Sequence, residues 1–355
     1  MNTVRRLFNK CLLKPSDFKP SQPDLEVIGA FNPGAIAFGD QVLLLIRIAE
    51  QAAERRLGKT ALPRWDTKVR RVVFDWEGND ELKPVDIRVV QRKRDGLVRL
   101  TFTSHLRVVR SQDGRNIESL DGARFEPEAE YEEFGVEDPR ITRIGDIFYI
   151  TYVAVSRHGA ATALASTRDF RSFTRHGIIF CAENKDCVLF PEKIGGHYFA
   201  FHRPNGATPF TRPEMWLASS PDLVHWGGHE YFLGGTKMWD VGRVGAGTPP
   251  LRTSQGWLEI YHGNSRREAD AGIGIYSSGA LLLDLDRPQK ILHAAGQMFV
   301  PETEYEREGF VPNVVFPTGI IQQGDNVLVY YGAADTYCAV VEFSLSEILA
   351  SLKEA

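Results

Sequence analysis

The sequence predicts an all-β chain, a five-bladed β-propeller followed by a C-terminal helix. Two motifs recur along the chain, a proline-led hairpin and a strand that runs into an acidic turn. The composition is also rich in turn formers and aromatic residues, with 32 Gly, 19 Pro, 21 Phe, 11 Tyr and 6 Trp. Repeated units of about 40–50 residues with four strands each are typical of propeller blades. Five matched units favour this fold over a β-sandwich with irregular repeats.

The proline-led motif occurs five times. Each copy holds a proline, a few apolar residues, a turn with Gly or Asp and then an apolar strand, which predicts a β-hairpin. The copies begin at Pro33, Pro139, Pro191, Pro249 and Pro317. The first interval is the longest, and we expect a short charged helical stretch over 50–59 and further strands over 74–110 to fill it.

The second motif is a strand that ends in Ser/Thr-x-Asp, a pattern that predicts an Asx-type turn. It occurs at Thr167-Arg168-Asp169 and Ser220-Pro221-Asp222, and more loosely at Ser111-Gln112-Asp113 and around Asp284. We therefore interpret it as the second half of the repeated unit.

The two ends of the chain complete the prediction. Residues 344–354 carry Leu345, Ile348, Leu349 and Leu352 at helical spacing, so a C-terminal helix is expected there. Residues 1–25 precede the first motif and are interpreted as an N-terminal extension. The whole chain, 1–355, is predicted to form a single propeller domain.

Composition narrows the class of protein. Lys and Arg number 42 against 46 Asp and Glu, a net charge of −4, which argues against a nucleic-acid partner. No apolar run approaches the ~18 residues of a membrane span, and the N-terminus does not resemble a secretory signal. The four cysteines lack the spacing of a zinc site. We expect a cytoplasmic protein with reduced thiols and no metal site.

Polar residues that suggest chemistry lie on the loops of the repeat. Asp138 precedes Pro139, which holds it in an extended segment; an isolated Asp-Pro of this kind is most often a turn cap. Four potentially cationic residues precede or end the innermost strands of successive units. Each alone is most often a solvated charge, but together they indicate an anion site: Lys185, Arg203, Arg243 and His262.

In this order the motifs resemble glycoside hydrolase family 130, the inverting β-mannoside phosphorylases and their hydrolytic relatives. The resemblance runs from residue 31 to 335. It rests on segments that include Phe31-Asn32-Pro33-Gly34, Glu137-Asp138-Pro139-Arg140, Asn184-Lys185-Asp186, His202-Arg203-Pro204, Gly245-Ala246-Gly247-Thr248-Pro249-Pro250 and Tyr330-Tyr331-Gly332-Ala333-Ala334-Asp335. The family fold is a five-bladed propeller, in agreement with the repeat count.

The resemblance also implies residue roles. Asp138 matches the general acid, whose proton is thought to reach the leaving oxygen through the 3-hydroxyl of the sugar. Lys185, Arg203, Arg243 and His262 match positions that hold phosphate, although Lys185 lacks the fork of the more familiar Arg and Arg243 stands where Lys is more familiar. The implied substrate-binding residues are Asn32, Arg47, Glu137 and Asp335, with Ser104, His105 and Arg107 in a Ser-His-Leu-Arg segment like that of members acting on β-1,2-mannosides.

The cations favour phosphorolysis. An inverting hydrolase needs a carboxylate base to activate water, whereas phosphate is already an anion and needs a cationic cradle instead. The sequence therefore predicts release of α-mannose 1-phosphate, most favourably from β-1,2-mannobiose or short β-1,2-mannooligosaccharides.

No cofactor is expected, because inorganic phosphate is a co-substrate; a homo-oligomer is possible. Three alternatives remain open. They are a phosphorylase of β-1,4-mannosyl-glucose or β-1,4-mannosyl-N-acetylglucosamine, an inverting β-mannosidase of the same fold, and a non-catalytic glycan-binding propeller. Loop aromatics are candidates for sugar stacking, namely Phe210, Trp239, Tyr305 and Tyr337.

Overall fold

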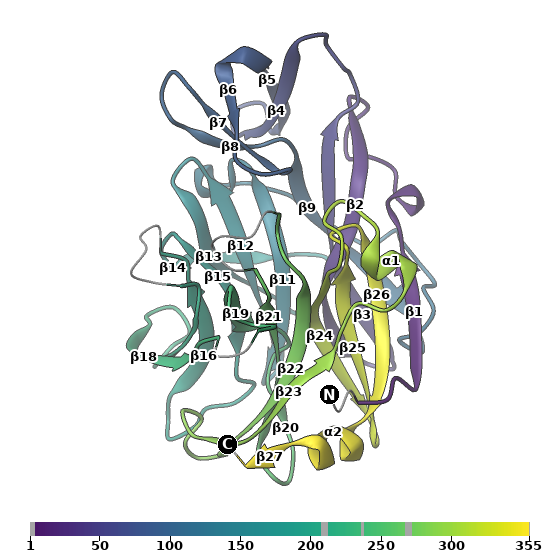
Figure 1. The fold of residues 1–355 in the computed structure, drawn as a ribbon, viewed down its shortest axis with the longest axis vertical. Helices are drawn as coiled ribbons and strands as arrows, with labels where there is room; N and C mark the ends of the chain where they lie inside the picture. Colours follow the sequence, from purple (N-terminus) through teal and green to yellow (C-terminus); the bar gives the residue numbers. More distant parts are fainter. Residues whose placement is uncertain (1–3, 207–211, 236–237, 267–271, 355) are drawn as a thin grey trace.

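The predicted all-β class is confirmed. The computed structural model describes residues 4–206, 212–235, 238–266 and 272–354, and these residues form five antiparallel sheets of four or more strands and two smaller sheets. Figure 1 shows the two smaller sheets at one end of the molecule and the C-terminal helix at the opposite end. Among the described residues, none of the helices has the length and apolar character that crossing a membrane requires.

Four sheets of the described chain have four strands each. In spatial order they are β10 (Arg124–Phe125), β9 (Thr103–Ser111), β3 (Gln41–Ala52) and β2 (Leu25–Phe38); β11 (Gly135–Ile144), β12 (Ile147–Ser156), β13 (Gly159–Thr167) and β14 (Thr174–Phe180); β15 (Asn184–Leu189), β16 (Tyr198–Pro204), β17 (Met215–Ser220) and β18 (Gly227–Leu233); and β1 (Phe8–Leu13), β26 (Tyr337–Ser344), β25 (Asn326–Ala333) and β24 (Val315–Gln323).

The fifth large sheet has six strands. They are β19 (Arg243–Ala246), β21 (Trp257–Asn264), β22 (Tyr276–Leu283), β23 (Ile291–Phe299) and β27 (Lys353–Glu354), with β20 (Leu251–Arg252) paired to β21. The small sheets follow β3 in the chain and comprise β4 (Lys59–Asp66) with β5 (Arg71–Gly78), and β6 (Leu82–Pro84), β7 (Val89–Arg92) and β8 (Val98–Leu100). The helices are α1 (Glu304–Arg307), α2 (Leu345–Ser351) and the 3₁₀ turns Pro15–Asp17, Asn79–Glu81 and Glu130–Glu132.

The residues just after the N-terminus complete a sheet made of C-terminal strands. β1 pairs with β26, with Phe8 opposite Glu342 and Asn9 opposite Val341. The segment 8–13 of the predicted extension is thus an edge strand, and its pairing joins the two ends of the described chain.

Each large sheet has one edge strand that packs against an edge strand of a neighbouring sheet; these edge strands are β2, β11, β15, β19 and β24. β2 contacts β24 and β11, β11 contacts β15, and β15 contacts β19. These strands bring the loops and bulges of different sheets to one place, where the candidate site lies.

The acidic-turn motif is confirmed. Asp169, Asp222, Asp113 and Asp284 each follow a strand, and the carboxylate of each accepts hydrogen bonds from backbone N–H groups two and three residues further on. This is the Asx turn that the Ser/Thr-x-Asp pattern predicts.

Two expectations need correction. The stretch 50–59 is not helical, because Glu50 continues β3 opposite Thr103 and its buried carboxylate accepts hydrogen bonds from the backbone and hydroxyl of Ser21. The position of the motif's proline relative to the strands also differs from one copy to another. Pro33, Pro139 and Pro317 lie within strands, whereas Pro191 follows β15 and Pro249 lies between β19 and β20.

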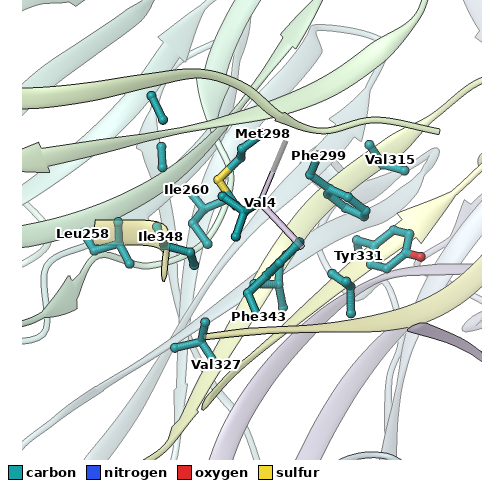
Figure 2. Close-up of a cluster of buried hydrophobic side chains, with 14 of the residues drawn as sticks. Val4, Leu258, Ile260, Met298, Phe299, Val315, Val327, Tyr331, Phe343 and Ile348 are labelled. Carbon is teal, nitrogen blue, oxygen red and sulfur yellow. The ribbon is translucent and has the colours of Figure 1, made fainter. Parts of the chain in front are cut away.

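The predicted C-terminal helix is present and shorter than expected. α2 begins after Ser344, whose hydroxyl accepts a hydrogen bond from the N–H of Glu347, a normal N-cap. Its buried face inserts Leu345 and Ile348 into a cluster between two sheets. Figure 2 shows Ile348 beside Leu258 and Ile260 of β21, with Val327, Tyr331 and Phe343 of the last sheet facing them. Apolar burial of this kind stabilises the contact between the sheets.

Candidate active site

A backbone bulge occurs at a corresponding place in three of these edge strands, β2, β11 and β15. The pairing register shifts between Phe31 and Gly34 in β2, between Glu137 and Arg140 in β11 and between Lys185 and Val188 in β15. At each shift one residue adopts a left-handed backbone: Asn32 (φ 47°), Asp138 (φ 47°) and Asp186 (φ 54°). Asn and Asp tolerate this region better than most residues with a Cβ atom, which explains the residue types. The bulges contribute all three residues to the wall of one cavity.

The cavity, of about 260 Å³, brings together most of the predicted site. Its wall draws on β2, β3, β11, β15, β16, β19 and the segment after β25. Of the twelve residues predicted from the sequence, eight line it: Asn32, Arg47, Glu137, Asp138, Lys185, Arg203, Arg243 and Asp335.

Asp138 is buried and held by two donors on one oxygen. Asn32 Nδ2 and Arg47 Nη1 donate to its Oδ1 at 2.7 Å and 2.9 Å. Arg140, behind it, donates to the backbone oxygen of Asp138 at 3.1 Å. Burial raises the pKa of this carboxyl, but Arg47 and Arg140 outweigh burial and hold the pKa below its ordinary value. In this arrangement Asp138 is ionised at neutral pH.

Arg47 organises the neighbouring charges. Its Nη2 donates to Glu137 Oε1 at 2.7 Å and its Nε donates to Ser104 Oγ at 3.1 Å. Its guanidinium also lies over the ring of Phe31, 4.7 Å from the centroid. Glu137 is shared, because Lys185 Nζ lies 3.7 Å from its other oxygen. Ser104 therefore helps to hold the guanidinium of Arg47 in place.

The predicted cations differ in their surroundings. Arg203 is buried, and its Nη1 lies 2.6 Å from Asp186 Oδ2 and donates to His262 Nε2 at 3.1 Å. His262 lies behind Arg203 and does not line the cavity. Burial lowers the pKa of His262, and Arg203 adds to this while Asp186 opposes it. His262 is therefore neutral near pH 7, so three of the four predicted cationic residues carry charge there.

Asp335 and Arg88 form the opposite side of the cavity. Asp335 is partly buried, and desolvation raises the pKa of its carboxyl although Arg88 and Arg47 oppose the shift. Arg88 Nη1 lies 3.6 Å from Asp335 Oδ2 and reaches it from the small sheet β6–β8. Arg88 could not be predicted from the sequence, because the segment before β7 carries no repeat.

The structure does not bring the Ser-His-Leu-Arg segment into this cavity. Ser104 and His105 line a separate cavity, where His105 Nδ1 lies 3.5 Å from a carboxylate oxygen of Glu50. Arg107 lies over the ring of Phe18, 5.6 Å from its centroid. Among the described residues, Ser104 is the one of the three whose side chain hydrogen-bonds a residue of the candidate site, Arg47.

The aromatic residues that line the cavity are not those that the sequence predicted. Trp239 packs on Tyr261, and Tyr305 and Tyr337 pack against the cluster of Figure 2. Phe210 lies outside the described residues. The rings that line the cavity come instead from strands and from the segments before β9 and β24, namely Phe31, Phe102, Tyr276, Phe310 and Phe316.

No group of three or more His, Cys, Asp or Glu side chains suited to a metal ion occurs in the described part of the chain.

Glu259, on β21, is a fully buried acid below the site. Its Oε1 accepts a hydrogen bond from Gly247 N at 3.2 Å, and its Oε2 has no hydrogen-bond partner among the described residues. Burial raises the pKa of Glu259 well above its ordinary value, against the weaker effects of the Gly247 N–H and Arg140. The folded protein thus holds a proton that the unfolded chain releases.

This proton predicts a pH dependence of stability. Because the folded-state pKa is raised, the contribution of Glu259 to stability is complete below the unfolded pKa of about 4.3 and is lost as pH rises towards the folded pKa. The loss is at most about 1.4 kcal/mol per pH unit. We expect Glu259→Gln to gain stability relative to wild type between about pH 5 and about pH 8, measured by urea unfolding. The exposed Glu230→Gln is the control, and a constant difference for Glu259→Gln would contradict the assignment.

Comparison with known proteins identifies the family of the chain. The family model described as beta-1,4-mannooligosaccharide phosphorylase, of glycoside hydrolase family 130, matches residues 87–354. The chain is 40% identical to the beta-1,2-mannobiose phosphorylase of Listeria innocua over 96% of both chains, and 36% identical to a 1,2-beta-oligomannan phosphorylase of Thermoanaerobacter over 70% of this chain and 81% of the relative. The solved structure of the Listeria enzyme with beta-1,2-mannobiose superposes with a TM-score of 0.89 at 39% identity, again over 96% of both chains. The chain belongs to glycoside hydrolase family 130.

Proposed function

We propose that this protein is an inverting β-mannoside phosphorylase that converts β-1,2-mannobiose or short β-1,2-mannooligosaccharides and phosphate into α-mannose 1-phosphate and a shortened acceptor. We further propose that its five large sheets are the blades of one propeller domain. The contacts among the edge strands β2, β11, β15, β19 and β24 support a radial arrangement. The β-1,2 linkage is supported by the names of the Listeria and Thermoanaerobacter relatives.

One observation carries the phosphorylase proposal: Asp138 shares a cavity with Lys185, Arg203 and Arg243. A hydrolase needs a carboxylate that is free to take a proton from water. Here three other carboxylates of the cavity lie beside cations, Glu137 with Arg47 and Lys185, Asp186 with Arg203, and the partly buried Asp335 with Arg88. Each of these carboxylates already has a cationic partner, so none of them stands free to take a proton from water, which supports phosphate over activated water as the nucleophile.

The low pKa of Asp138 in the free protein has a consequence for the reaction. A general acid must be protonated when the leaving oxygen departs. A phosphate ion bound beside Lys185, Arg203 and Arg243 adds negative charge to the same cavity and raises the pKa of Asp138. Asp138 therefore takes up its proton as the substrates assemble, and then passes it to the leaving oxygen by way of the sugar 3-hydroxyl.

A phosphate-dependence assay tests the proposal. β-1,2-Mannobiose, β-1,4-mannobiose and β-1,4-mannosyl-glucose are each incubated with the protein, with and without phosphate. We expect mannose 1-phosphate only with phosphate and fastest from the β-1,2-linked sugar. Free mannose formed equally without phosphate would show a hydrolase, and no product in either condition would favour a binding protein.

A glycine next to the cations offers an independent test. A Cβ atom on Gly245 would lie 2.5 Å from Asp186 Oδ2 and 2.7 Å from His262 Cε1, and both side chains are buried and unable to move freely. We expect Gly245→Ala to displace them and with them Arg203, raising the KM for phosphate roughly 10-fold and costing about 1–3 kcal/mol of stability. The control is Gly227→Ala, a strand glycine with open space at its Cβ position. An unchanged KM for phosphate would contradict the assignment of Arg203.

A further inference from the structure

Asp186 is a carboxylate placed among cations, and the proposed reaction gives it no role. It is 2% exposed, lies at the bulge of β15 and lines the cavity. Its Oδ2 lies 2.6 Å from Arg203 Nη1 and 3.3 Å from His262 Nε2, and its Oδ1 accepts a hydrogen bond from Arg140 at 3.4 Å. A negative charge here weakens the attraction of the site for any anion, so its presence calls for an explanation.

The carboxylate is ionised, and its Oδ2 is ion-paired with Arg203 but accepts no hydrogen bond of good geometry from the described residues. Burial raises the pKa of Asp186, but the guanidinium of Arg203, with a further contribution from Arg140, outweighs burial and holds the pKa far below its ordinary value. Although Arg203 and His262 lie close to Oδ2, neither donates to it with hydrogen-bond geometry, and Oδ2 has no hydrogen-bond partner in the described residues. Asp186 is thus a hydrogen-bond acceptor that stays an acceptor at all physiological pH values.

An ionised carboxylate accepts hydrogen bonds and cannot donate them. An oxyanion oxygen beside it must therefore carry a proton, since two bare anionic oxygens repel each other in a buried site. Near neutral pH inorganic phosphate and arsenate keep at least one proton, whereas sulfate and selenate keep none. The buried acceptor thus distinguishes anions of the same shape by their protonation.

We propose that Asp186 makes the cavity selective for a protonated oxyanion, by accepting a hydrogen bond from the P–OH group of phosphate. This rests on the proposed function and names the feature by which the site recognises its second substrate. The P–OH group turned towards Asp186 leaves the other three oxygens for Arg203, Arg243 and Lys185 and for attack on the sugar.

Isothermal titration calorimetry without sugar tests the proposal. Wild-type protein is titrated at neutral pH with phosphate, arsenate, sulfate and selenate. Arsenate and selenate are close in size, so their comparison isolates protonation from fit. We expect phosphate and arsenate to bind and sulfate and selenate to bind at least roughly 100-fold more weakly, because the fully ionised anions leave the acceptor unpaired and facing another anion.

The variant Asp186→Asn removes the charge and supplies a donor, and Asn tolerates the left-handed backbone at this position. We expect it to reduce the ratio of arsenate to selenate affinity at least roughly 10-fold. The control Glu183→Gln removes a carboxylate from the rim of the same cavity, where Glu183 Oε1 accepts a hydrogen bond from Ala160 N, and should leave that ratio unchanged.

Equal binding of arsenate and selenate by the wild type would overturn the proposal whether or not the variant folds. A ratio that Asp186→Asn leaves at the wild-type value would overturn it as well. These outcomes are distinct from failure of the proposed function. A protein that shows phosphorolysis yet binds selenate as well as arsenate remains a phosphorylase, whereas a wild type that binds no phosphate contradicts both.

Discussion

Asp138→Asn should lower the rate of phosphorolysis of β-1,2-mannobiose by roughly 10³-fold or more, because removing a general acid costs about 10²- to 10⁴-fold and the sugar leaving group needs a proton. The amide keeps an oxygen for Asn32 Nδ2 and Arg47 Nη1, which donate to Oδ1 in the wild type. Asn also adopts the left-handed backbone found at this position. Folding and phosphate binding should therefore survive.

The identity of the leaving group separates loss of an acid from loss of structure. p-Nitrophenol leaves without protonation, so Asp138→Asn should lose far less activity on p-nitrophenyl β-mannoside than on mannobiose. The control is Asp146→Asn, at the exposed turn of the same hairpin, where the side chain is 86% exposed. Equal losses on both substrates would rule out a proton-donor role for Asp138.

The sequence predicts which residues lie at the cavity better than it predicts where the repeated prolines fall relative to the strands. Asp138, Lys185, Arg203 and Arg243 could be found because each is a charged residue next to an apolar strand, and the structure brings all four to one cavity. Asp186 escaped because the third copy of the bulge lacks the proline that follows Asn32 and Asp138; Cys187 takes its place. Comparing the residue one position before Pro33, Pro139 and Cys187 is the signal that would have identified it.

Other features are tertiary and leave no local pattern. Arg88 reaches Asp335 from an inserted small sheet, and nothing near Arg88 in the sequence predicts that meeting. The charge of His262 could not be predicted either, because burial and the neighbouring Arg203 decide it. Ser104 and His105 were both predicted to bind substrate. Consecutive residues of a strand face opposite sides of the sheet, so Ser104 reaches Arg47 and His105 does not.

Arg203→Ala should raise the KM for phosphate by roughly 10²- to 10³-fold while changing the KM for mannobiose far less. A buried guanidinium makes charge-assisted hydrogen bonds to phosphate, each of which contributes about 1.5–3 kcal/mol. The variant also leaves Asp186, 2.6 Å from Arg203 Nη1 in the wild type, without its nearest cation. Removing one partner of a buried ion pair costs about 3–5 kcal/mol of stability, so the alanine variant alone is ambiguous.

A series of variants removes that ambiguity. Arg203→Lys keeps the charge and loses the fork, so its KM for phosphate should lie between those of wild type and alanine. Arg203→Met combined with Asp186→Asn removes both members of the pair and should recover stability in urea unfolding without recovering phosphate affinity. Arg252→Ala, which breaks an exposed pair with Glu192, is the control for loss of an arginine. If the double variant regained phosphate affinity, the weak binding of Arg203→Ala would reflect the uncompensated Asp186 charge. If the double variant binds phosphate far more weakly than Asp186→Asn alone, Arg203 itself binds the phosphate.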